Sequence, residues 1–471
     1  MGGLVREAGR DTRLASDMRS TLDRRLPGWL LSAALALSCG TRAPEAAPNI
    51  LLVSLDTTRA DHCSPYGYAR DTTPSLARLA EAGLCFDAAY APSSTTSPSH
   101  ATMFTGQYPI SHRVLSNGLD LAAQHRTLAE VLTEAGYETA AVVSSFVLHS
   151  KFGLGQGFSD YDDALPMEEA LPRGDERTLY KGEELEDAFD RRAEFATSRA
   201  LSWLERERDP ARPFFLFVHY MDPHNRVAPP EPYLTAFGNG PDGVAVDRYD
   251  AMIAYTDQEL GRLVDGLERL GLEDTLVVVT GDHGEGLMQH GYMTHGVQIY
   301  EESVRVPFVV RWLPRVAAGT RILEPVELVD LAPTLLEVAG VGTELERAQG
   351  QLLTGALLGT GTLDPEREVF LFRRPYRETV KSGIPVSGVQ YGLRVGRWKL
   401  IWGPDEGREE LYDLVADPGE AVDRAADEPE RVADMRARLG DLVAESSSSA
   451  AVEDSSTEVD REKLRALGYV R

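Results

Sequence analysis

Apolar runs and stretches of helical spacing alternate along most of the chain. The continuous apolar runs are rich in β-branched residues, which is typical of strands buried on both faces. Five such runs occur, at residues 50–55, 139–143, 214–219, 275–280 and 306–311. Apolar positions at helical spacing lie between them, at 74–82, 127–135, 190–208 and 249–270. This alternation predicts an α/β fold with a large, mostly parallel sheet sandwiched by helices.

The pattern changes after about residue 366 to short β-type runs. The runs 391–395 and 398–402 flank a Gly-Arg pair, which predicts a β-hairpin. A helical stretch at 428–445 and a Ser-rich stretch at 446–456 follow. We therefore expect a large domain over 49–365, a smaller subdomain over 366–445, and a Ser-rich linker with a short C-terminal helix over 446–471. The acidic stretch 164–188 is expected to be a surface excursion bordering the pocket, or simply a loop.

The first 48 residues have the layout of an export signal followed by a linker. The apolar stretch 26–38 follows Arg24-Arg25 and precedes Cys39. It is too short for a transmembrane helix, which needs about 20 apolar residues. We expect secretion across the inner membrane, to a periplasmic location or as a lipoprotein attached to a membrane through a lipidated Cys39. Ordinary signal cleavage without lipid remains the alternative.

Composition narrows the class of function. The chain has 471 residues and a formal net charge of −26, which argues against nucleic-acid binding through a basic face. Only Cys63 and Cys85 follow the signal segment, so the protein is no disulfide scaffold, although one bridge between them is left open.

Residues suited to metal binding end two of the predicted strands. Asp56 follows the run 50–55, and Asp282-His283 follows the run 275–280. An open α/β sheet binds its ligands at the carboxyl ends of its strands, so these side chains are expected to meet. Thr96 adds a hydroxyl, and Pro98 suits the first turn of a helix that Thr96 precedes. The N–H groups of that helix would face a bound anion.

These residues predict one divalent metal ion beside a reactive oxygen. The ligand set is Asp56, Thr96, Asp282 and His283, whose oxygen and nitrogen atoms suit Zn²⁺, Mn²⁺ or Ca²⁺. A threonine hydroxyl is a weak nucleophile at neutral pH, and a bound cation would activate it.

Several segments in fixed order carry a resemblance to a known family. They are 49–62, 96–106, 219–224, 281–285, 300–307, 396–400 and 410–414. Together they resemble the sulfatase family of the alkaline phosphatase superfamily, over roughly residues 48 to 425. The resemblance implies the sulfatase-type α/β fold with a smaller C-terminal antiparallel sheet.

The chain departs from that family at the expected nucleophile. Sulfatases carry a Cys or Ser that is oxidised to formylglycine, followed by Pro two places on and Arg four places on. Here the frame has Thr96 first, Pro98 third and His100 last. Threonine cannot become formylglycine, so we expect no such cofactor. The stretch is similar instead to the nucleotide pyrophosphatase/phosphodiesterase branch, in which an unmodified threonine attacks phosphorus.

The resemblance also implies roles for other side chains. His224 matches a substrate-contacting histidine, and His295, with His290 as the alternative, lies where the family places the group that protonates the leaving oxygen. His100 or His224 would balance the charge of the transferred group. Asp61 is a candidate for replacing a missing ligand, and Lys399 for reaching the pocket. A two-metal site that adds Asp222, His224 and His295 is the mechanistic rival.

The predicted function is a metal-dependent hydrolase that cleaves sulfate or phosphate/phosphonate esters through Thr96, with unmodified threonine favouring phosphorus esters. The substrate would be a small-molecule, glycan or lipid ester. Two alternatives stay open. One is a phosphotransferase or phosphodiesterase acting on envelope lipids or glycans, and the other is a degenerate homologue that binds glycans without cleaving them.

Overall fold

The computed structural model describes residues 47–165, 190–224, 229–238, 245–342, 345 and 347–446, together with the backbone of β6 (Leu179–Tyr180) and β7 (Glu183–Glu184). The predicted signal segment, Cys39 and the Ser-rich C-terminal linker lie outside these residues, as does most of the acidic stretch 164–188. Among the described helices, none has the length and apolar character needed to cross a membrane.

An eight-stranded sheet forms the centre of the fold. From edge to edge its strands are β12 (Thr320–Ile322), β2 (Leu84–Phe86), β11 (Phe308–Arg311), β9 (Leu276–Gly281), β1 (Ile50–Leu55), β8 (Phe214–Tyr220), β4 (Glu138–Val142) and β5 (Asp160–Asp162). The five strands from β9 to β5 are parallel, whereas β11 runs antiparallel to both of its neighbours. The predicted mostly parallel sheet is confirmed.

The register of the three central strands aligns their carboxyl ends. Leu55 of β1 lies opposite Tyr220 of β8 and Gly281 of β9. The residues that follow these three positions therefore emerge at the same edge of the sheet. This alignment brings together side chains that are more than 200 positions apart in the chain.

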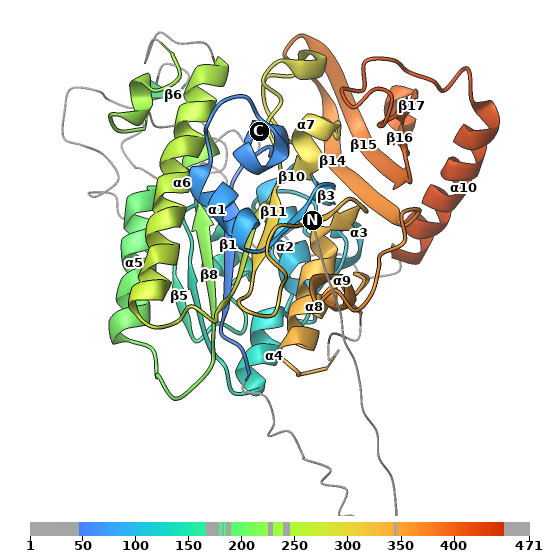
Figure 1. Ribbon diagram of the computed structural model, residues 1–471. Helices are drawn as coiled ribbons and strands as arrows, with labels where there is room; N and C mark the ends of the chain where they lie inside the picture. Colours follow the sequence, from blue (N-terminus) through green and yellow to red (C-terminus); the bar gives the residue numbers. More distant parts are fainter. Residues whose placement is uncertain are drawn as a thin grey trace, which may run out of the picture. The chain divides into compact units, whose positions relative to one another are not determined.

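Helices cover both faces of the sheet, as the alternating pattern predicts. Successive residues of β1 point to opposite faces, so Leu51 and Val53 belong to one core cluster and Ile50 and Leu52 to the other. The first cluster packs against α1 (Pro74–Ala82), α5 (Ala193–Arg206) and α6 (Ala245–Arg269). The second packs against α2 (Thr96–Thr105), α4 (Leu128–Glu134) and α8 (Leu331–Val338). Figure 1 shows α5 and α6 side by side on one face.

A four-stranded antiparallel sheet follows in the C-terminal part, as the family resemblance implies. Its strands, in spatial order, are β14 (Glu368–Lys381), β15 (Ile384–Val395), β16 (Trp398–Gly403) and β17 (Arg408–Asp413). The predicted hairpin is the β15–β16 pair.

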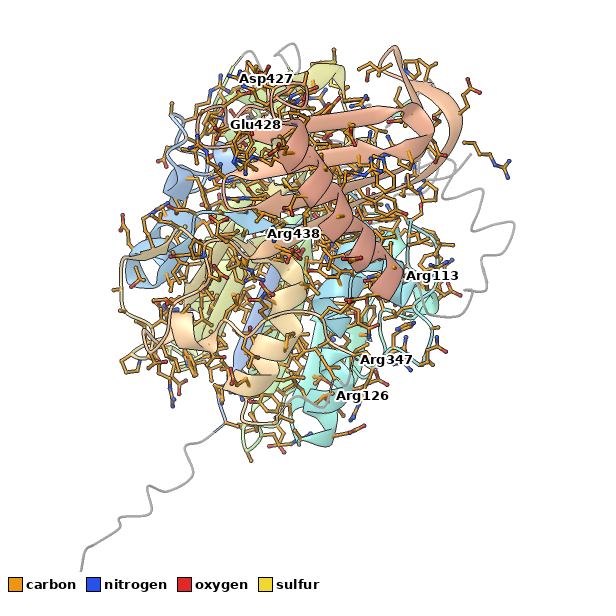
Figure 2. The ribbon with its side chains drawn as sticks, turned by 90° about the vertical axis from the view of Figure 1, so that its right-hand side faces the viewer. Arg113, Arg126, Arg347, Asp427, Glu428 and Arg438 are labelled. Carbon is orange, nitrogen blue, oxygen red and sulfur yellow. The ribbon has the colours of Figure 1, made fainter. Side chains whose placement is uncertain are left out.

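The long helix α10 (Pro429–Ser446) packs on this second sheet through Val432, Met435 and Leu439. Burial of each such side chain contributes about 1.5–3 kcal/mol. Figure 2 shows Asp427 and Glu428 at the start of α10, where carboxylates favour the positive end of the helix. Arg438, farther along the helix, donates to Glu368 of β14 at 2.6 Å.

Smaller elements complete the chain. A three-stranded sheet consists of β10 (Arg305–Val306), β3 (Ala89–Tyr90) and β13 (Val326–Glu327). The described chain also has three single-turn helices, α3 (Pro109–His112), α7 (Glu301–Val304) and α9 (Thr354–Leu357). One expectation needs correction: helix α2 begins at Thr96 itself, with Thr95 as its N-cap, so Thr96 does not precede the helix. The bridge that the sequence left open does not form, because Cys63 and Cys85 are both buried free thiols.

Candidate active site

Three side chains able to bind a metal converge at the carboxyl edge of the main sheet. Asp56 follows β1, and Asp282 and His283 follow β9. Their ligand atoms all lie within 4.8 Å of one another, and all three residues are fully buried. The aligned register of β1 and β9 brings them together, so the geometry follows directly from the strand pairing.

The hydrogen bonds of Asp282 leave one carboxylate oxygen facing this cluster. Asp282 Oδ1 accepts the backbone N–H of Thr57 at 3.0 Å and that of His283 at 2.8 Å. Thr57 has a φ of 50°, an uncommon left-handed conformation for a β-branched residue. Asp282 Oδ2 is buried and has no hydrogen-bond partner among the described residues. Burial, and then the neighbouring Asp56, raise the pKa of Asp282.

The tautomer of His283 adds a third electron-pair donor. Its Nδ1–H donates to the carbonyl of Gly284 at 2.9 Å, so in the neutral ring Nε2 carries a lone pair. Nε2 lies 3.4 Å from Asp282 Oδ2 and 3.9 Å from Asp56 Oδ1. Three buried acceptors facing one another repel, and a cation between them converts that repulsion into coordination. The residues present fit a divalent metal ion.

Thr96 lies beside this cluster at the start of α2. Its side chain is fully buried, and Oγ1 is 3.2 Å from His283 Nε2. Two hydrogen bonds fix this end of the helix: Ser97 N–H donates to Asn117 Oδ1 at 2.7 Å, and Ser99 Oγ donates to the carbonyl of Asp282 at 2.7 Å. The four predicted ligands Asp56, Thr96, Asp282 and His283 are thus brought together, and their role in metal binding stays a prediction.

His219, the sixth residue of β8, belongs to this site and was missed by the sequence reasoning. Its Nδ1 accepts the backbone N–H of Ser144 at 3.4 Å, and its Nε2–H donates to Asp56 Oδ2 at 3.2 Å. Burial lowers the pKa of His219 to about 4, so the ring is neutral at pH 7. The ring orients the Asp56 carboxylate. The available signal was a histidine inside an apolar strand, which is costly unless the ring has partners.

His100 is close to the cluster but uses both ring nitrogens elsewhere. Its Nδ1–H donates to the carbonyl of Thr96 at 2.9 Å, and its Nε2 accepts the hydroxyl of Ser54 at 2.9 Å. Burial lowers its pKa to about 3. The structure therefore presents no available ring nitrogen of His100 to a substrate, and the geometry gives no support to its predicted contact with the transferred group. What it does is hold the backbone at Thr96.

His224 and His295 lie beside the cluster, and their predicted catalytic roles stay predictions. His224 ends the short turn Asp222–His224 that follows β8. The ring centroid of His295 lies 4.9 Å from that of His224 and 4.6 Å from that of His283. His295 Nδ1–H donates to Glu285 Oε2 at 3.0 Å, which leaves Nε2 on the opposite side of the ring. Glu285 is itself held by the backbone N–H of Gly286 at 2.9 Å.

Three other candidates lie in different contacts. Asp61 pairs with Arg59 at 2.6 Å and is not part of the metal-type cluster. His290 bonds to Glu302 at 2.9 Å and to the carbonyl of Glu420 at 3.0 Å. Lys399 is fully buried between the carboxylates of Glu301 and Glu420, at 3.0 and 2.9 Å. His290 and Lys399 thus connect the segment 290–302 to the second sheet and to Glu420, which follows it.

A family model described as "Sulfatase" matches residues 48–341, which include every residue of the cluster. The chain belongs to the sulfatase family. A second model, described as "N-sulphoglucosamine sulphohydrolase, C-terminal", matches residues 289–447. The protein is accordingly a hydrolase of the sulfatase type.

Similar proteins extend over nearly the whole described chain. An N-acetylglucosamine-6-O-sulfatase from Bacteroides thetaiotaomicron is 25% identical, over 86% of this chain and 88% of that protein. Arylsulfatase K from Rattus norvegicus is also 25% identical, over 85% of this chain and 80% of its own. The solved structure of the phosphonate monoester hydrolase of Agrobacterium radiobacter matches with a TM-score of 0.66 and 24% sequence identity. The match covers 85% of this chain and 96% of the hydrolase chain, and it shows that the two share a fold.

Proposed function

We propose that this member of the sulfatase family is a metal-dependent ester hydrolase in which the unmodified Thr96 hydroxyl is the nucleophile. One observation carries the proposal. Thr96 Oγ1 lies 3.2 Å from His283 Nε2, at the edge of the buried Asp56–Asp282–His283 cluster. A hydroxyl at that position is adjacent both to a fitting cation site and to the N-terminus of α2.

Asp56, Asp282 and His283 would hold the ion, and its bound charge would lower the pKa of a neighbouring hydroxyl and offset negative charge on the transferred group. The mixed oxygen and nitrogen donors favour Zn²⁺ or Mn²⁺ over Ca²⁺, which prefers an all-oxygen shell. His219 orients Asp56 by the 3.2 Å hydrogen bond between the two side chains.

The reaction then proceeds in two displacements. Thr96 Oγ, having lost its proton to solvent, attacks the phosphorus or sulfur atom, and the bond from that atom to the alcohol oxygen breaks. His295, oriented by Glu285, gives a proton to that departing oxygen. Water next attacks the phosphorus or sulfur atom of the threonyl ester and gives one proton to His295. The bond from that atom to Thr96 Oγ breaks, and Thr96 Oγ takes a proton back from solvent. The positive N-terminal end of α2 and His224 stabilise the oxygens of the transferred group.

Phosphate and phosphonate esters are the favoured substrates. A formylglycine enzyme releases sulfate through collapse of a hemiacetal, and an ordinary threonyl ester has no such route. Phosphoryl transfer to and from a plain hydroxyl needs only positioning and charge stabilisation. Sulfate ester cleavage is the second candidate, because the curated relatives are named as sulfatases, and the sugar named in one of them supports a glycan alcohol.

The place of action is proposed from the N-terminal segment. Its apolar stretch and Cys39 support export to the periplasm, with or without lipid attachment to a membrane. A mass measurement on the purified mature protein would distinguish the two forms, because lipidation adds acyl chains to Cys39.

Initial rates test the chemistry. Aryl phosphate, alkyl phosphonate, phosphate diester and aryl sulfate are compared with Zn²⁺, Mn²⁺ or Ca²⁺, for the wild type, Thr96→Ala and Thr96→Ser. We expect a phosphorus ester to be preferred, activity to be lost in Thr96→Ala, and part of it to return in Thr96→Ser. Ser97→Ala is the matched control, because its hydroxyl donates to the carbonyl of Val147 at 2.9 Å. Unchanged turnover in Thr96→Ala would exclude Thr96 as nucleophile, and binding without turnover of any ester would indicate a degenerate homologue.

A further inference from the structure

A single tyrosine hydroxyl holds the turn that follows β1. Tyr249, near the start of α6, is buried, and its hydroxyl donates to the carbonyl of Thr57 at 2.5 Å. The same oxygen accepts the backbone N–H of Arg59 at 2.9 Å. Burial raises the pKa of Tyr249, so the hydroxyl keeps the proton that it donates. Both hydrogen bonds therefore go to the backbone of one turn, residues 57–59, which is 190 or more positions away in the chain.

The first residue of this turn is strained. Thr57 has a φ of 50°, a left-handed conformation that a β-branched residue rarely adopts. Backbone strain of this kind persists only where the surrounding structure enforces it. The next residue lies close against the end of β9, because a Cβ on Gly281 would be 2.8 Å from the carbonyl oxygen of Thr58. Contacts with distant segments, and not the local sequence, therefore keep the turn in place.

The strained residue also contacts the metal-type cluster. The backbone N–H of Thr57 donates to Asp282 Oδ1 at 3.0 Å, and the backbone N–H of His283 donates to the same oxygen at 2.8 Å. These two bonds orient the carboxylate so that its Oδ2 lies 3.4 Å from His283 Nε2. A different backbone conformation at Thr57 would remove one of the two bonds that orient Asp282.

The same turn contacts the segment that carries the proposed proton donor. The Arg59 guanidinium donates to the carbonyl of Glu285 at 3.2 Å and to Gln289 Oε1 at 2.8 Å. Glu285 in turn accepts the Nδ1–H of His295. One turn, fixed by one hydroxyl, thus connects the metal-type cluster with the pair Glu285 and His295.

We propose that Tyr249 is a positioning residue of the active site. Its hydroxyl holds Thr57 in the left-handed conformation, and Thr57 in turn keeps Asp282 oriented for the metal ion. Tyr249 acts through the backbone of the turn and is not itself a ligand. The inference rests on the proposed function for the presence of that ion.

Metal binding to the full chain tests the role without turnover. Calorimetry with Mn²⁺ and Zn²⁺ compares the EDTA-stripped wild type with Tyr249→Phe, which keeps the edge-on ring contact with His62 at 5.1 Å. We expect Kd to rise about tenfold, the scale of the lost hydrogen bonds. Tyr255→Phe is the matched control, because Tyr255 is also buried on α6 and its hydroxyl accepts only the backbone N–H of Glu194, at 3.4 Å, among the contacts described. The control should bind both ions as the wild type does.

Thermal melts separate positioning from a merely structural role. A structural hydroxyl would lower the melting temperature of Tyr249→Phe equally in EDTA and in Mn²⁺, and would leave Kd unchanged. A positioning hydroxyl should lower the melting temperature more in Mn²⁺ than in EDTA. Hydrogen exchange in EDTA reports on the turn itself: the peptide 56–60 should exchange faster in Tyr249→Phe than in Tyr255→Phe, and equal exchange would overturn the inference.

Relief of the strain gives an independent test. Glycine adopts a positive φ without strain, so a chain with Thr57→Gly should depend less on the Tyr249 hydroxyl. In that background Tyr249→Phe should weaken Mn²⁺ binding several-fold less than it does in the wild-type background. Equal losses in the two backgrounds would overturn the inference.

The outcomes distinguish this inference from the proposed function. A wild type that binds none of Zn²⁺, Mn²⁺ and Ca²⁺ would overturn both. A wild type that binds Mn²⁺ with the same Kd as Tyr249→Phe would overturn the role of Tyr249 alone and leave the proposed function in place.

Discussion

Replacing Asp282 by asparagine should stabilise the metal-free protein and abolish its stabilisation by metal. Asp282 Oδ1 accepts two backbone N–H groups, and an asparagine oxygen can accept both. Asp282 Oδ2 has no hydrogen-bond partner among the described residues and faces Asp56 and His283. The substitution therefore removes a repelling charge and leaves the local backbone bonds intact.

The distances give the size of the effect. The ligand atoms of Asp56 and Asp282 lie within 4.8 Å of each other. Two like charges at that separation repel by about 3.5 kcal/mol at an effective dielectric constant of about 20. Asp282→Asn should recover about 1–3 kcal/mol of this in a chelator, because an amide dipole replaces the charge. In the wild type, a free ion at about 100 times its Kd should add about 2.7 kcal/mol.

Thermal melts in EDTA and in Zn²⁺, Mn²⁺ or Ca²⁺ measure both effects. The wild type should melt several degrees higher with its preferred ion, and the variant should melt above the wild type in EDTA and respond little to metal. Asp265→Asn, an exposed carboxylate on α6, is the control and should change neither melt. The reasoning is refuted if no divalent ion stabilises the wild type, or if Asp282→Asn lowers the midpoint in EDTA.

Four further predictions follow from individual contacts. Burial raises the pKa of Asp222 to about 7, so the folded chain keeps this proton between about pH 4 and pH 7 while the unfolded chain loses it. The free energy of unfolding therefore contains a contribution from this proton that is complete at low pH. That contribution, at most about 4 kcal/mol, is lost as the pH rises from about 4 through 7. Urea unfolding of Asp222→Asn should accordingly show a flatter pH dependence than the wild type. Gly157→Ala should lower the free energy of unfolding by more than about 3 kcal/mol in urea, because its Cβ would lie 2.1 Å from a backbone nitrogen. Gly67→Ala is the control: its φ is also 85° but its Cβ would lie in open space, so it should cost about 1 kcal/mol. Equal costs for the two variants would contradict this prediction. His295→Ala should slow esters of alkyl alcohols by about a hundredfold or more but nitrophenyl esters far less, and a uniform loss would argue against its role as the acid. Thr127→Ala should cost about 1 kcal/mol by removing the capping box of α4, measured by chemical unfolding.

Local pattern was sufficient to predict most of the elements and the positions of Asp56 and Asp282 at strand ends. The apolar runs at 50–55 and 275–280 became β1 and β9 within one residue, because a strand buried on both faces needs an unbroken apolar sequence. Asp56 and Asp282 directly follow those strands, so their meeting at one edge required only that the strands be parallel and in the same sheet. Antiparallel β11 did not follow from its pattern, since a buried run has the same composition in either direction.

The sequence by itself thus determined the α/β class, the placement of Asp56, Thr96, Asp282 and His283 at strand or helix ends, and the family. Tertiary structure alone decided the partners of the remaining polar groups. His100 bonds to Ser54 and Thr96, and His219 bonds to Asp56. Lys399 is enclosed by carboxylates, and Arg192 forms a loose ion pair with Asp222 at 3.9 Å. The periodicity of apolar residues predicts which face of a helix or strand a residue occupies. The partner of a buried charge depends on segments far away in the chain, and only their packing sets whether a hydrogen bond is formed.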